Sequence, residues 1–320
     1  MLDKYLKLEE IYNAKTRISK LTFQTPIIKS EILSEEFGKG IYFKCEFMHE
    51  VGSFKIRGVA NKVLKQIENG HKPRMLVTAS SGNHGIAVAY VGNLLKIPVV
   101  VFVPEVGTDY KLYKMSRLGA KIIRAGKYSD IANRHAEKYA NENGALYIHS
   151  YDDPDVISGQ GTVGLEIYEQ NKNIDCVIFP VGGGGLIAGA SYYLKQINPE
   201  IKVIGVQSES VPSMYDAMLK NKIITVKAKK TIAEGMAVRK VGKIAFEVSK
   251  KYVDEILLVK EEEIINSLIK IFDAERILIE ASAASSFAII FRYKEKLKNN
   301  NCFVLTGRNI SSKIFKKVLR

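Results

Sequence analysis

The sequence predicts an α/β protein with mostly parallel β-sheets flanked by helices. Short runs rich in β-branched residues alternate along the chain with longer amphipathic runs, which is the pattern of consecutive βα units. Glycine, proline or polar residues bound the inner short runs. Of the 320 residues, 46% are hydrophobic and 26% are charged, a globular composition with length enough for two domains or one large one.

The individual elements follow from this alternation. The expected strands, in chain order, are Gly40–Cys45, Met75–Thr78, Val99–Val103, Lys121–Arg124, Cys176–Pro180, Val203–Val206 and Cys302–Thr306. The expected helices include Lys111–Leu118, Ser129–Glu142, Leu186–Gln196, Glu261–Ala274 and Ala283–Lys296. Strands that alternate with helices in this way usually pair in parallel.

Two polar stretches, Asn69–Arg74 and Tyr151–Asp155, indicate how the chain divides. The segment between them has its own alternation of strands and helices. We therefore expect a small inserted domain over residues 75–152 and a large domain over residues 1–66 and 153–320. A cleft between two such domains is where a ligand is expected.

Composition and charge exclude several classes of protein. The three cysteines lie far apart, which leaves neither a disulfide framework nor a CxxC metal site and fits a reducing compartment. No apolar run approaches the ~20 residues of a membrane span, and the first residues lack the apolar core of a signal peptide. We expect a cytoplasmic protein that does not bind a membrane.

The net charge of +14 raises the alternative of nucleic-acid binding. The excess lysines are scattered through helical stretches and the C-terminus, with no zinc-finger spacing and no arginine-rich arm. A solvated basic surface is the better interpretation, and we expect no nucleic-acid partner.

A run of four glycines, Gly182 to Gly185, follows an expected strand and opens an expected helix at Leu186. Consecutive glycines let backbone N–H groups crowd around an anion, and the N-terminal end of a helix favours negative charge. A P-loop is excluded because no Gly-Lys-Ser/Thr follows, and the dinucleotide fingerprint lacks its third glycine and its acidic residue. The run predicts a site for a monophosphate; a strained strand-to-helix turn is the alternative.

Two further motifs carry candidate chemistry. In Gly52–Gly58, the apolar neighbours of Lys55 can lower its pKa and expose a nucleophilic amine, whereas Arg57 is expected in a structural ion pair. In Thr78–Gly85, small hydroxyl and glycine residues at a helix start offer donors to a carboxylate. The alternative for this second motif is that Ser80 or Ser81 simply caps the helix.

Taken together and in this order, the three motifs resemble the serine/threonine dehydratase and serine racemase family of fold type II pyridoxal 5′-phosphate enzymes. The resemblance runs from about Thr22 to the end of the chain and includes Tyr151–Pro154, Gly159–Thr162 and Gly205–Glu209. Thr231–Gly235 resembles the family's TIADG pattern with glutamate in place of aspartate. The resemblance implies two domains of the tryptophan synthase β-like fold with the cofactor between them.

The resemblance also implies roles for single residues. Lys55 resembles the lysine that binds the cofactor covalently, Phe54 packs on the cofactor ring, and Asn83 bonds its 3′-oxygen. The phosphate would be held by Gly182, Gly183, Gly184, Gly185 and Leu186. Thr306 contacts the pyridine nitrogen and Glu280 lies near the cofactor, while the substrate carboxylate would be bound by Ser80, Ser81, Asn83 and His84.

The implied activity is that of an ammonia-lyase that converts L-threonine or L-serine into a 2-oxo acid and ammonia by β-elimination. Ser81 resembles the second acid/base of serine racemases, so racemisation is the alternative, as is a lyase for another β-substituted amino acid. At the metal positions of animal and yeast racemases this chain has Gln207, Val211 and Ser213, so we expect no metal. The resemblance also implies a homodimer or homotetramer. A pseudoenzyme that only binds the cofactor is disfavoured, because a protein without catalytic activity would not need the reactive amine of Lys55.

Departures from the family pattern concern the substrate. Arg308 stands in Thr306-Gly307-Arg308-Asn309, where relatives carry glycine. Arg308 is a candidate to bind a second anionic group of the substrate; the alternative is that it points outward. His49 replaces a usual glutamine, and a structural role is the more frequent outcome for a lone histidine.

Overall fold

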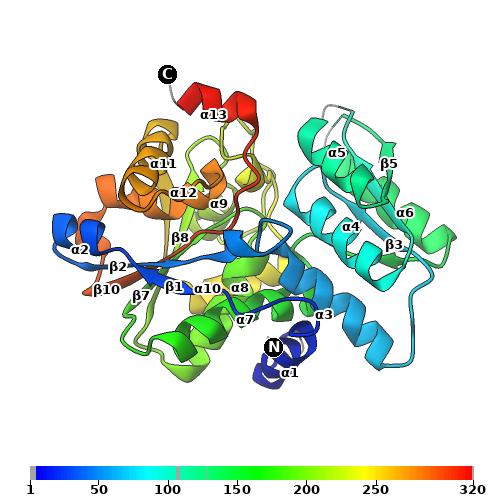
Figure 1. Cartoon of the computed structure of the whole chain (residues 1–320), viewed down its shortest axis with the longest axis horizontal. Helices are drawn as coiled ribbons and strands as arrows, with labels where there is room; N and C mark the ends of the chain where they lie inside the picture. The colour runs from blue at the N-terminus through cyan, green and yellow to red at the C-terminus, as the bar shows by residue number, and fades with distance from the viewer. Residues whose placement is uncertain (1–4, 106–108, 128, 319–320) are drawn as a thin grey trace.

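The computed structural model describes residues 5–105, 109–127 and 129–318, so the outer ends of the predicted large domain lie outside the described residues (Figure 1). Within that part of the chain there are two sheets. The six-stranded sheet has the order β1-β2-β10-β7-β8-β9, in which only β1 is antiparallel to its neighbour. The four-stranded sheet, β5-β4-β3-β6, is entirely parallel. The predicted α/β fold class is confirmed.

The strands of the large sheet are β1 (Ile27–Lys29), β2 (Gly40–Lys44), β7 (Cys176–Pro180), β8 (Lys202–Ser208), β9 (Glu255–Val259) and β10 (Asn300–Val304). Those of the small sheet are β3 (Leu76–Ala79), β4 (Val99–Val103), β5 (Lys121–Arg124) and β6 (Leu146–Tyr147).

The helices are α1 (Leu8–Ile18), α2 (Glu31–Phe37), α3 (Lys55–Glu68), α4 (Asn83–Leu95), α5 (Asp109–Arg117), α6 (Ser129–Glu142), α7 (Pro154–Gln170), α8 (Gly185–Ile197), α9 (Ser213–Leu219), α10 (Lys243–Tyr252), α11 (Glu261–Glu275), α12 (Ala281–Ala288) and α13 (Ser312–Val318). Short 3₁₀ turns occur at Glu46–Met48, Glu234–Met236, Ile289–Phe291 and Lys294–Lys296. No helix in the described ranges is both long and apolar enough to cross a membrane. The three cysteines are free and buried.

Most predicted elements are present, and the differences have physical causes. The helix predicted to reach Lys296 ends at Ala288, and 3₁₀ turns follow, where the Arg292 side chain forms ion pairs with Glu209 and Glu263. The last strand ends at Val304, because beyond it the chain bonds elsewhere: the Thr306 carbonyl accepts a hydrogen bond from the Phe54 N–H (3.1 Å).

Both faces of the large sheet are covered, which explains its apolar strands. Along β7, Val177 and Phe179 face the core shared with α7, α8 and α10, whereas Cys176 and Ile178 face the core shared with α11 and α12. Figure 1 shows these two sets of helices on opposite sides of the sheet.

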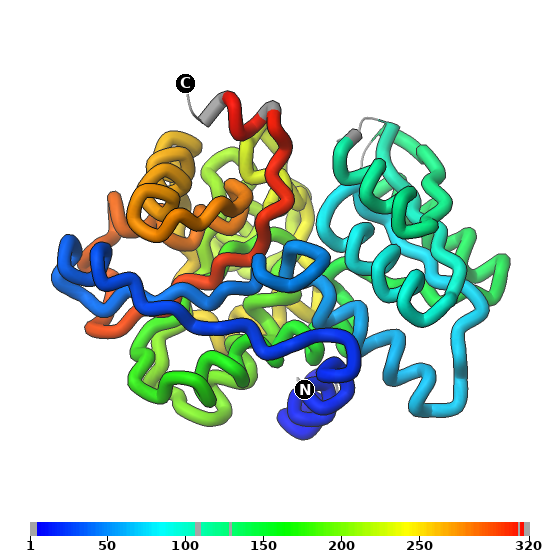
Figure 2. The backbone as a smooth tube through the Cα atoms, in the orientation of Figure 1, coloured from blue at the N-terminus to red at the C-terminus, as the bar shows by residue number. Residues whose placement is uncertain are grey.

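The small sheet packs between α4 and α6, and α3 connects it to the rest of the molecule (Figure 2). Ile56, Val59 and Val63 of α3 lie in the same core as Val101 of β4 and Val88 of α4. The predicted large domain includes most of α3, so this helix contributes to both parts. The division at residues 66, 75 and 152 stays a prediction.

A buried ion-pair network anchors the start of α3. The Arg57 guanidinium lies 2.7 Å from a Glu46 carboxylate oxygen and 2.6 Å from one of Glu166, and Lys44 lies 2.6 Å from Glu166. All four side chains are buried. Burial alone would raise the pKa of Glu46, but the Arg57 guanidinium holds it well below its usual value. The structural ion pair predicted for Arg57 is confirmed.

Removing the buried cation is therefore expected to destabilise the fold. Arg57→Met removes the guanidinium that neutralises Glu46 in the core and leaves Glu166 with Lys44 as its remaining cation, so it should lower the free energy of unfolding by about 3–5 kcal/mol. Urea denaturation measures this, with Arg134→Met as the control because Arg134 is an exposed arginine 3.8 Å from Asp130. Equal stability of the two variants would contradict the role of the network.

Candidate active site

The three sequence motifs meet where the two sheets face each other. Lys55 is the first residue of α3, and the glycine run and Thr78–Gly85 follow the carboxyl ends of β7 and β3. Two contacts join the parts: the Lys55 Nζ donates to the Ser150 carbonyl (2.8 Å), and the Asn83 amide donates to Glu280 Oε1 (2.6 Å). The carboxyl ends of parallel strands are the usual place for a site in α/β folds.

Lys55 is a half-buried lysine held by a neutral group. Its ammonium donates to the Ser150 carbonyl and lies 5.1 Å from the centre of the Phe54 ring. Burial lowers the pKa of Lys55 from 10.5 to about 8. A much larger share of this amine is therefore neutral near pH 8 than for an ordinary lysine, which makes it a nucleophile and a base.

The glycine run forms a cradle of backbone donors. Helix α8 begins at Gly185, and Gly184 before it has φ +94°, a conformation that favours glycine. A Cβ on Gly183 would collide with the ring of Tyr151, and one on Gly185 would lie 2.7 Å from the Tyr151 carbonyl oxygen. The N–H groups that open α8 have no partner inside the helix, so they can bind an anion.

The Thr78–Gly85 motif does not use its serines as a helix cap. Helix α4 begins at Asn83 with Gly82 as its N-cap, and Ser80 Oγ instead accepts a hydrogen bond from the Gly82 N–H (3.1 Å). The alternative that Ser80 or Ser81 caps the helix is therefore wrong. The free N–H groups that open α4 stay available to a carboxylate.

His84 is a neutral imidazole in this arrangement. Its Nε2 lies 3.1 Å from the Ile148 carbonyl oxygen, so Nε2 carries the proton and Nδ1 is an acceptor. Burial, with Lys55 close by, lowers the pKa of His84 to about 3. Nδ1 is buried and has no hydrogen-bond partner within the described residues. A carboxylate near His84 would therefore be bound by its backbone N–H and not by its ring.

Thr306 and Glu280 lie beside the Lys55 segment. Thr306 is buried, and its carbonyl accepts the Phe54 N–H; the Glu280 N–H donates to the carbonyl of Gly307 (3.0 Å). Burial raises the pKa of Glu280, whose carboxylate lies 4.0 Å from Lys111.

The residues that depart from the family pattern are placed differently. The Arg308 side chain is exposed, while its backbone N–H donates to the carbonyl of Gly52 (2.9 Å). His49 is buried, 3.3 Å from Glu46 and against the Phe23 ring, which fits the structural role that is usual for a lone histidine. The role of Arg308 stays a prediction.

The positions compared with the racemase metal site also have structural roles. Gln207 Oε1 accepts the N–H groups of Met214 and Tyr215 at the start of α9, and its Nε2 donates to the carbonyl of Val181 (3.2 Å). The absence of a metal stays a prediction.

Two groups at the candidate active site were not predicted from the sequence. The Ser150 carbonyl that holds Lys55 has no sequence signal, because any residue supplies a carbonyl. Tyr151, which the sequence placed in a linker, packs against Gly183 and Gly185 of the glycine run. Its hydroxyl donates to the carbonyl of Lys240 (3.1 Å). The resemblance of Tyr151–Pro154 to the family was the signal that could have identified it.

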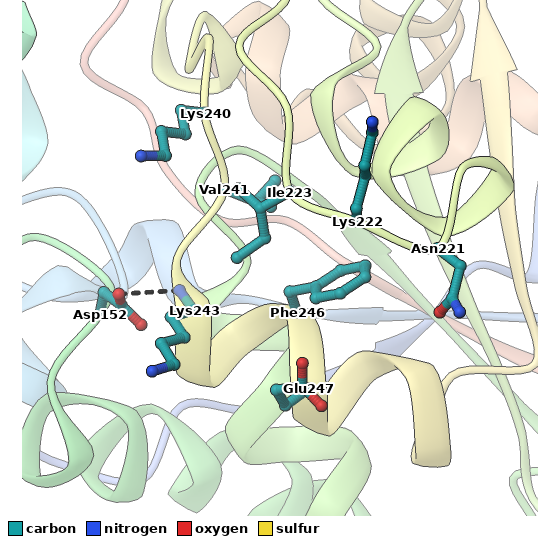
Figure 3. A pocket seen from close by; sticks show the side chains of 9 residues that line it. All are labelled: Asp152, Asn221, Lys222, Ile223, Lys240, Val241, Lys243, Phe246 and Glu247. Carbon is teal, nitrogen blue, oxygen red and sulfur yellow. Dashed lines mark hydrogen bonds between the residues drawn. The ribbon is translucent and has the colours of Figure 1, made fainter.

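A cavity of about 520 Å³ lies behind the glycine run, at the start of α10 (Figure 3). Its centre is apolar, with Ile223, Val241 and Phe246, and lysines lie at its rim. Asp152, one of its lining residues, accepts the N–H groups of Lys243 and Ile244 (2.8 Å each). None of the residues that line this cavity belongs to the three sequence motifs.

Comparison with known proteins gives consistent matches over nearly the whole chain. The pyridoxal-phosphate dependent enzyme family matches residues 18–307. An L-threonine ammonia-lyase of Thermotoga maritima is 37% identical over 98% of this chain and 78% of its own length. The crystal structure of a threonine deaminase from T.th. has a TM-score of 0.90 at 31% identity, covering 96% of this chain and 99% of its own. Maize serine racemase has a TM-score of 0.92 at 28% identity, covering 98% and 97%.

Because the pKa of Lys55 is lowered, its amine should become reactive at a lower pH than the amine of an ordinary lysine. Because only the neutral amine reacts, trace acetylation of the ligand-free chain should label Lys55 with a midpoint near pH 8. Mass spectrometry measures the labelling, with N-acetyl-lysine amide in the same mixture as the reference at about 10.4. A Lys55 midpoint equal to that of the reference would contradict the buried, neutral amine.

Proposed function

The chain belongs to the pyridoxal-phosphate dependent enzyme family, and we propose that it is an L-threonine and L-serine ammonia-lyase. The observation that carries the proposal is the Lys55 amine, with its pKa lowered to about 8, at the opening between the glycine run and the start of α4. The reaction releases a 2-oxo acid and ammonia by β-elimination. The names of the threonine ammonia-lyase and threonine deaminase relatives support this choice of substrate.

The residues present fit pyridoxal 5′-phosphate. The glycine run leaves no room for side chains on Gly183 and Gly185, and the N–H groups of Gly185 and Leu186 open a helix of 13 residues that favours a dianion. Gly182, Gly183, Gly184, Gly185 and Leu186 would hold the phosphate. Lys55 would bind the aldehyde, Phe54 would cover the ring, and Asn83 would donate to the phenolic oxygen.

When bound, the cofactor supplies an electron sink next to the substrate's α-carbon. The Lys55 amine, about half of which is neutral near pH 8, is the group that can take the α-proton. The N–H groups that open α4, with Ser80, Ser81 and Asn83, orient the substrate carboxylate so that this proton faces Lys55. Burial keeps the His84 ring neutral, so it adds no charge to the site.

Thr306 and Glu280 set the electrostatics around the ring. With the cofactor bound, Thr306 would offer a neutral hydroxyl to the ring nitrogen, and a hydroxyl would not sustain a proton there as a carboxylate would. Such a weaker electron sink would favour prompt loss of the substrate's β-hydroxyl group. Glu280 acts through Asn83, whose amide it accepts at 2.6 Å.

Amino-acid racemisation is the second candidate, and Ser81 is the residue that favours it. Ser81 is half-buried at the start of α4 and supplies a hydroxyl in addition to the amine of Lys55. The similarity to maize serine racemase supports this alternative. A lyase for another β-substituted amino acid would use the same residues.

We also infer a homodimer or homotetramer located in the cytoplasm. Exposed apolar side chains on neighbouring helices support assembly: Ile32 on α2, and Ile269 and Phe272 on α11, with exposed fractions of 58%, 40% and 39%. An ion pair between Lys270 and Glu36 joins these two helices. The free, buried thiols fit a reducing compartment.

The main test is a substrate panel that measures 2-oxo acid release together with chiral analysis of the remaining amino acid. The parent enzyme should release 2-oxo acid from L-threonine and L-serine, and Lys55→Ala should reduce the rate by at least about 10³-fold. Ser81→Ala is the matched variant: it should abolish any D-amino acid formation, and because it keeps the backbone N–H groups it should lower 2-oxo acid release far less than Lys55→Ala does. D-amino acid formation without 2-oxo acid would favour the racemase.

Arg308 can be tested on the same panel. We propose that it binds a second anionic group, because its side chain is exposed and lies near Lys114: burial lowers the pKa of Lys114, and the charge of Arg308 lowers it further. Arg308→Gly should lower kcat/KM for 3-hydroxyaspartate about tenfold or more, through loss of a charge-assisted contact, and leave L-serine unchanged. An unchanged ranking of the substrates refutes this role.

A further inference from the structure

We propose that Lys114, on α5, is a positioning residue that fixes the orientation of the Asn83 amide through Asn309. The inference rests on the proposed function, because it takes Asn83 as the donor to the cofactor's phenolic oxygen. Neither Lys114 nor Asn309 was singled out as a site residue by the motifs.

Four side chains form one continuous relay. The Lys114 Nζ donates to Asn309 Oδ1 (3.2 Å), and the Asn309 Nδ2 donates to Asn83 Oδ1 (2.9 Å). The Asn83 Nδ2 then donates to Glu280 Oε1 (2.6 Å). The Val51 carbonyl accepts from both Lys114 (3.3 Å) and Asn309 (2.9 Å), which holds the first two members together.

The ammonium group gives this relay its direction. An asparagine amide can usually rotate by 180° and exchange its oxygen and nitrogen, but a lysine only donates. Lys114 therefore requires the oxygen of Asn309 to face it. The Asn309 nitrogen must then face Val51 and Asn83, which in turn requires the oxygen of Asn83 to face Asn309.

The consequence at the site is a fixed N–H donor. With its oxygen directed to Asn309, Asn83 presents its NH₂ group toward Glu280, and that group has a second proton to donate. A reversed Asn83 amide would direct its oxygen at the Glu280 carboxylate and at any acceptor in the site. Two facing oxygen atoms in a buried place cost free energy, because neither is hydrated.

The relay also spans the two parts of the molecule. Lys114 and Asn83 belong to α5 and α4, which pack with the small sheet, whereas Glu280 precedes α12, which packs on the large one. Asn309 is only 5% exposed, so water does not compete for its amide. Lys114 is half-buried, and among its described contacts no carboxylate accepts a hydrogen bond from it.

The experiment measures cofactor affinity and the spectrum of the bound cofactor, not turnover. Ligand-free protein is titrated with pyridoxal 5′-phosphate, and the dissociation constant and absorption maximum are recorded. Lys114→Met should raise the dissociation constant about tenfold and shift the absorption maximum, because the Asn83 amide is no longer fixed. Lys114→Arg keeps the donors and should restore both values.

Two variants separate positioning from a structural effect. Arg117→Met removes an exposed cation from the same helix and should leave affinity and spectrum unchanged. Asn309→Asp keeps an acceptor for Lys114 but cannot donate to Asn83, so it should reproduce the defect of Lys114→Met.

The inference is overturned if Lys114→Met binds the cofactor with the affinity and spectrum of Arg117→Met. If Lys114→Met does not fold, Asn309→Asp is measured in the same assay instead. A dissociation constant and an absorption maximum equal to those of the parent protein would then overturn the inference. Failure of the proposed function is distinguishable: a parent protein that binds the cofactor but forms no 2-oxo acid refutes the lyase and leaves the relay testable.

Discussion

The arrangement of the site depends on one buried contact, that of the Lys55 amine with the carbonyl of Ser150. A lysine that donates to a neutral oxygen in a partly dehydrated place gains no opposite charge to stabilise its proton, so its pKa falls to about 8. A carboxylate at the same position would have kept the amine charged and unreactive. The site therefore needs an amine that is surrounded by polar groups but by no nearby acid.

That requirement explains how charge is distributed around the start of α3. Two residues after Lys55, Arg57 is paired with Glu46 and Glu166, so the acids next to this helix are already neutralised by a guanidinium. On the other side, His84 stays neutral and burial raises the pKa of Glu280. Donors in the site come mainly from backbone N–H groups at the starts of α4 and α8, which supply positive potential without a titrating group.

The sequence predicted those parts of the site that depend on local residue type. Gly182 to Gly185 predicted a strand-to-helix turn without side chains, and Lys55 stood between apolar neighbours, because both features are local in the chain. The carbonyl of Ser150 and the relay through Asn309 could not be predicted from local patterns, because they join segments 95 and 226 residues apart. Any residue could supply the first of these contacts, and the second depends on how the fold brings two asparagine side chains together. Likewise, β1, β6 and β9 were not among the predicted strands. Strands of three and two residues, as in β1 and β6, carry too short a pattern to recognise, and the short apolar run of β9 cannot be told from a helix segment by its periodicity.

The distribution of fixed and titrating donors also bears on how the site distinguishes substrates. A carboxylate bound by helix N-termini is recognised at any pH at which the substrate is ionised, so the α-carboxylate imposes little selectivity among amino acids. Selectivity must then come from groups that face the rest of the substrate. Among those described, Ser81 can add a second proton donor and Arg308 a positive charge, and each would change a different step: Ser81 the fate of the α-carbon, and Arg308 the choice of side chain. If the proposed roles hold, a single scaffold with one lysine base could serve elimination or racemisation of neutral or acidic amino acids through changes at two positions outside the cofactor cradle.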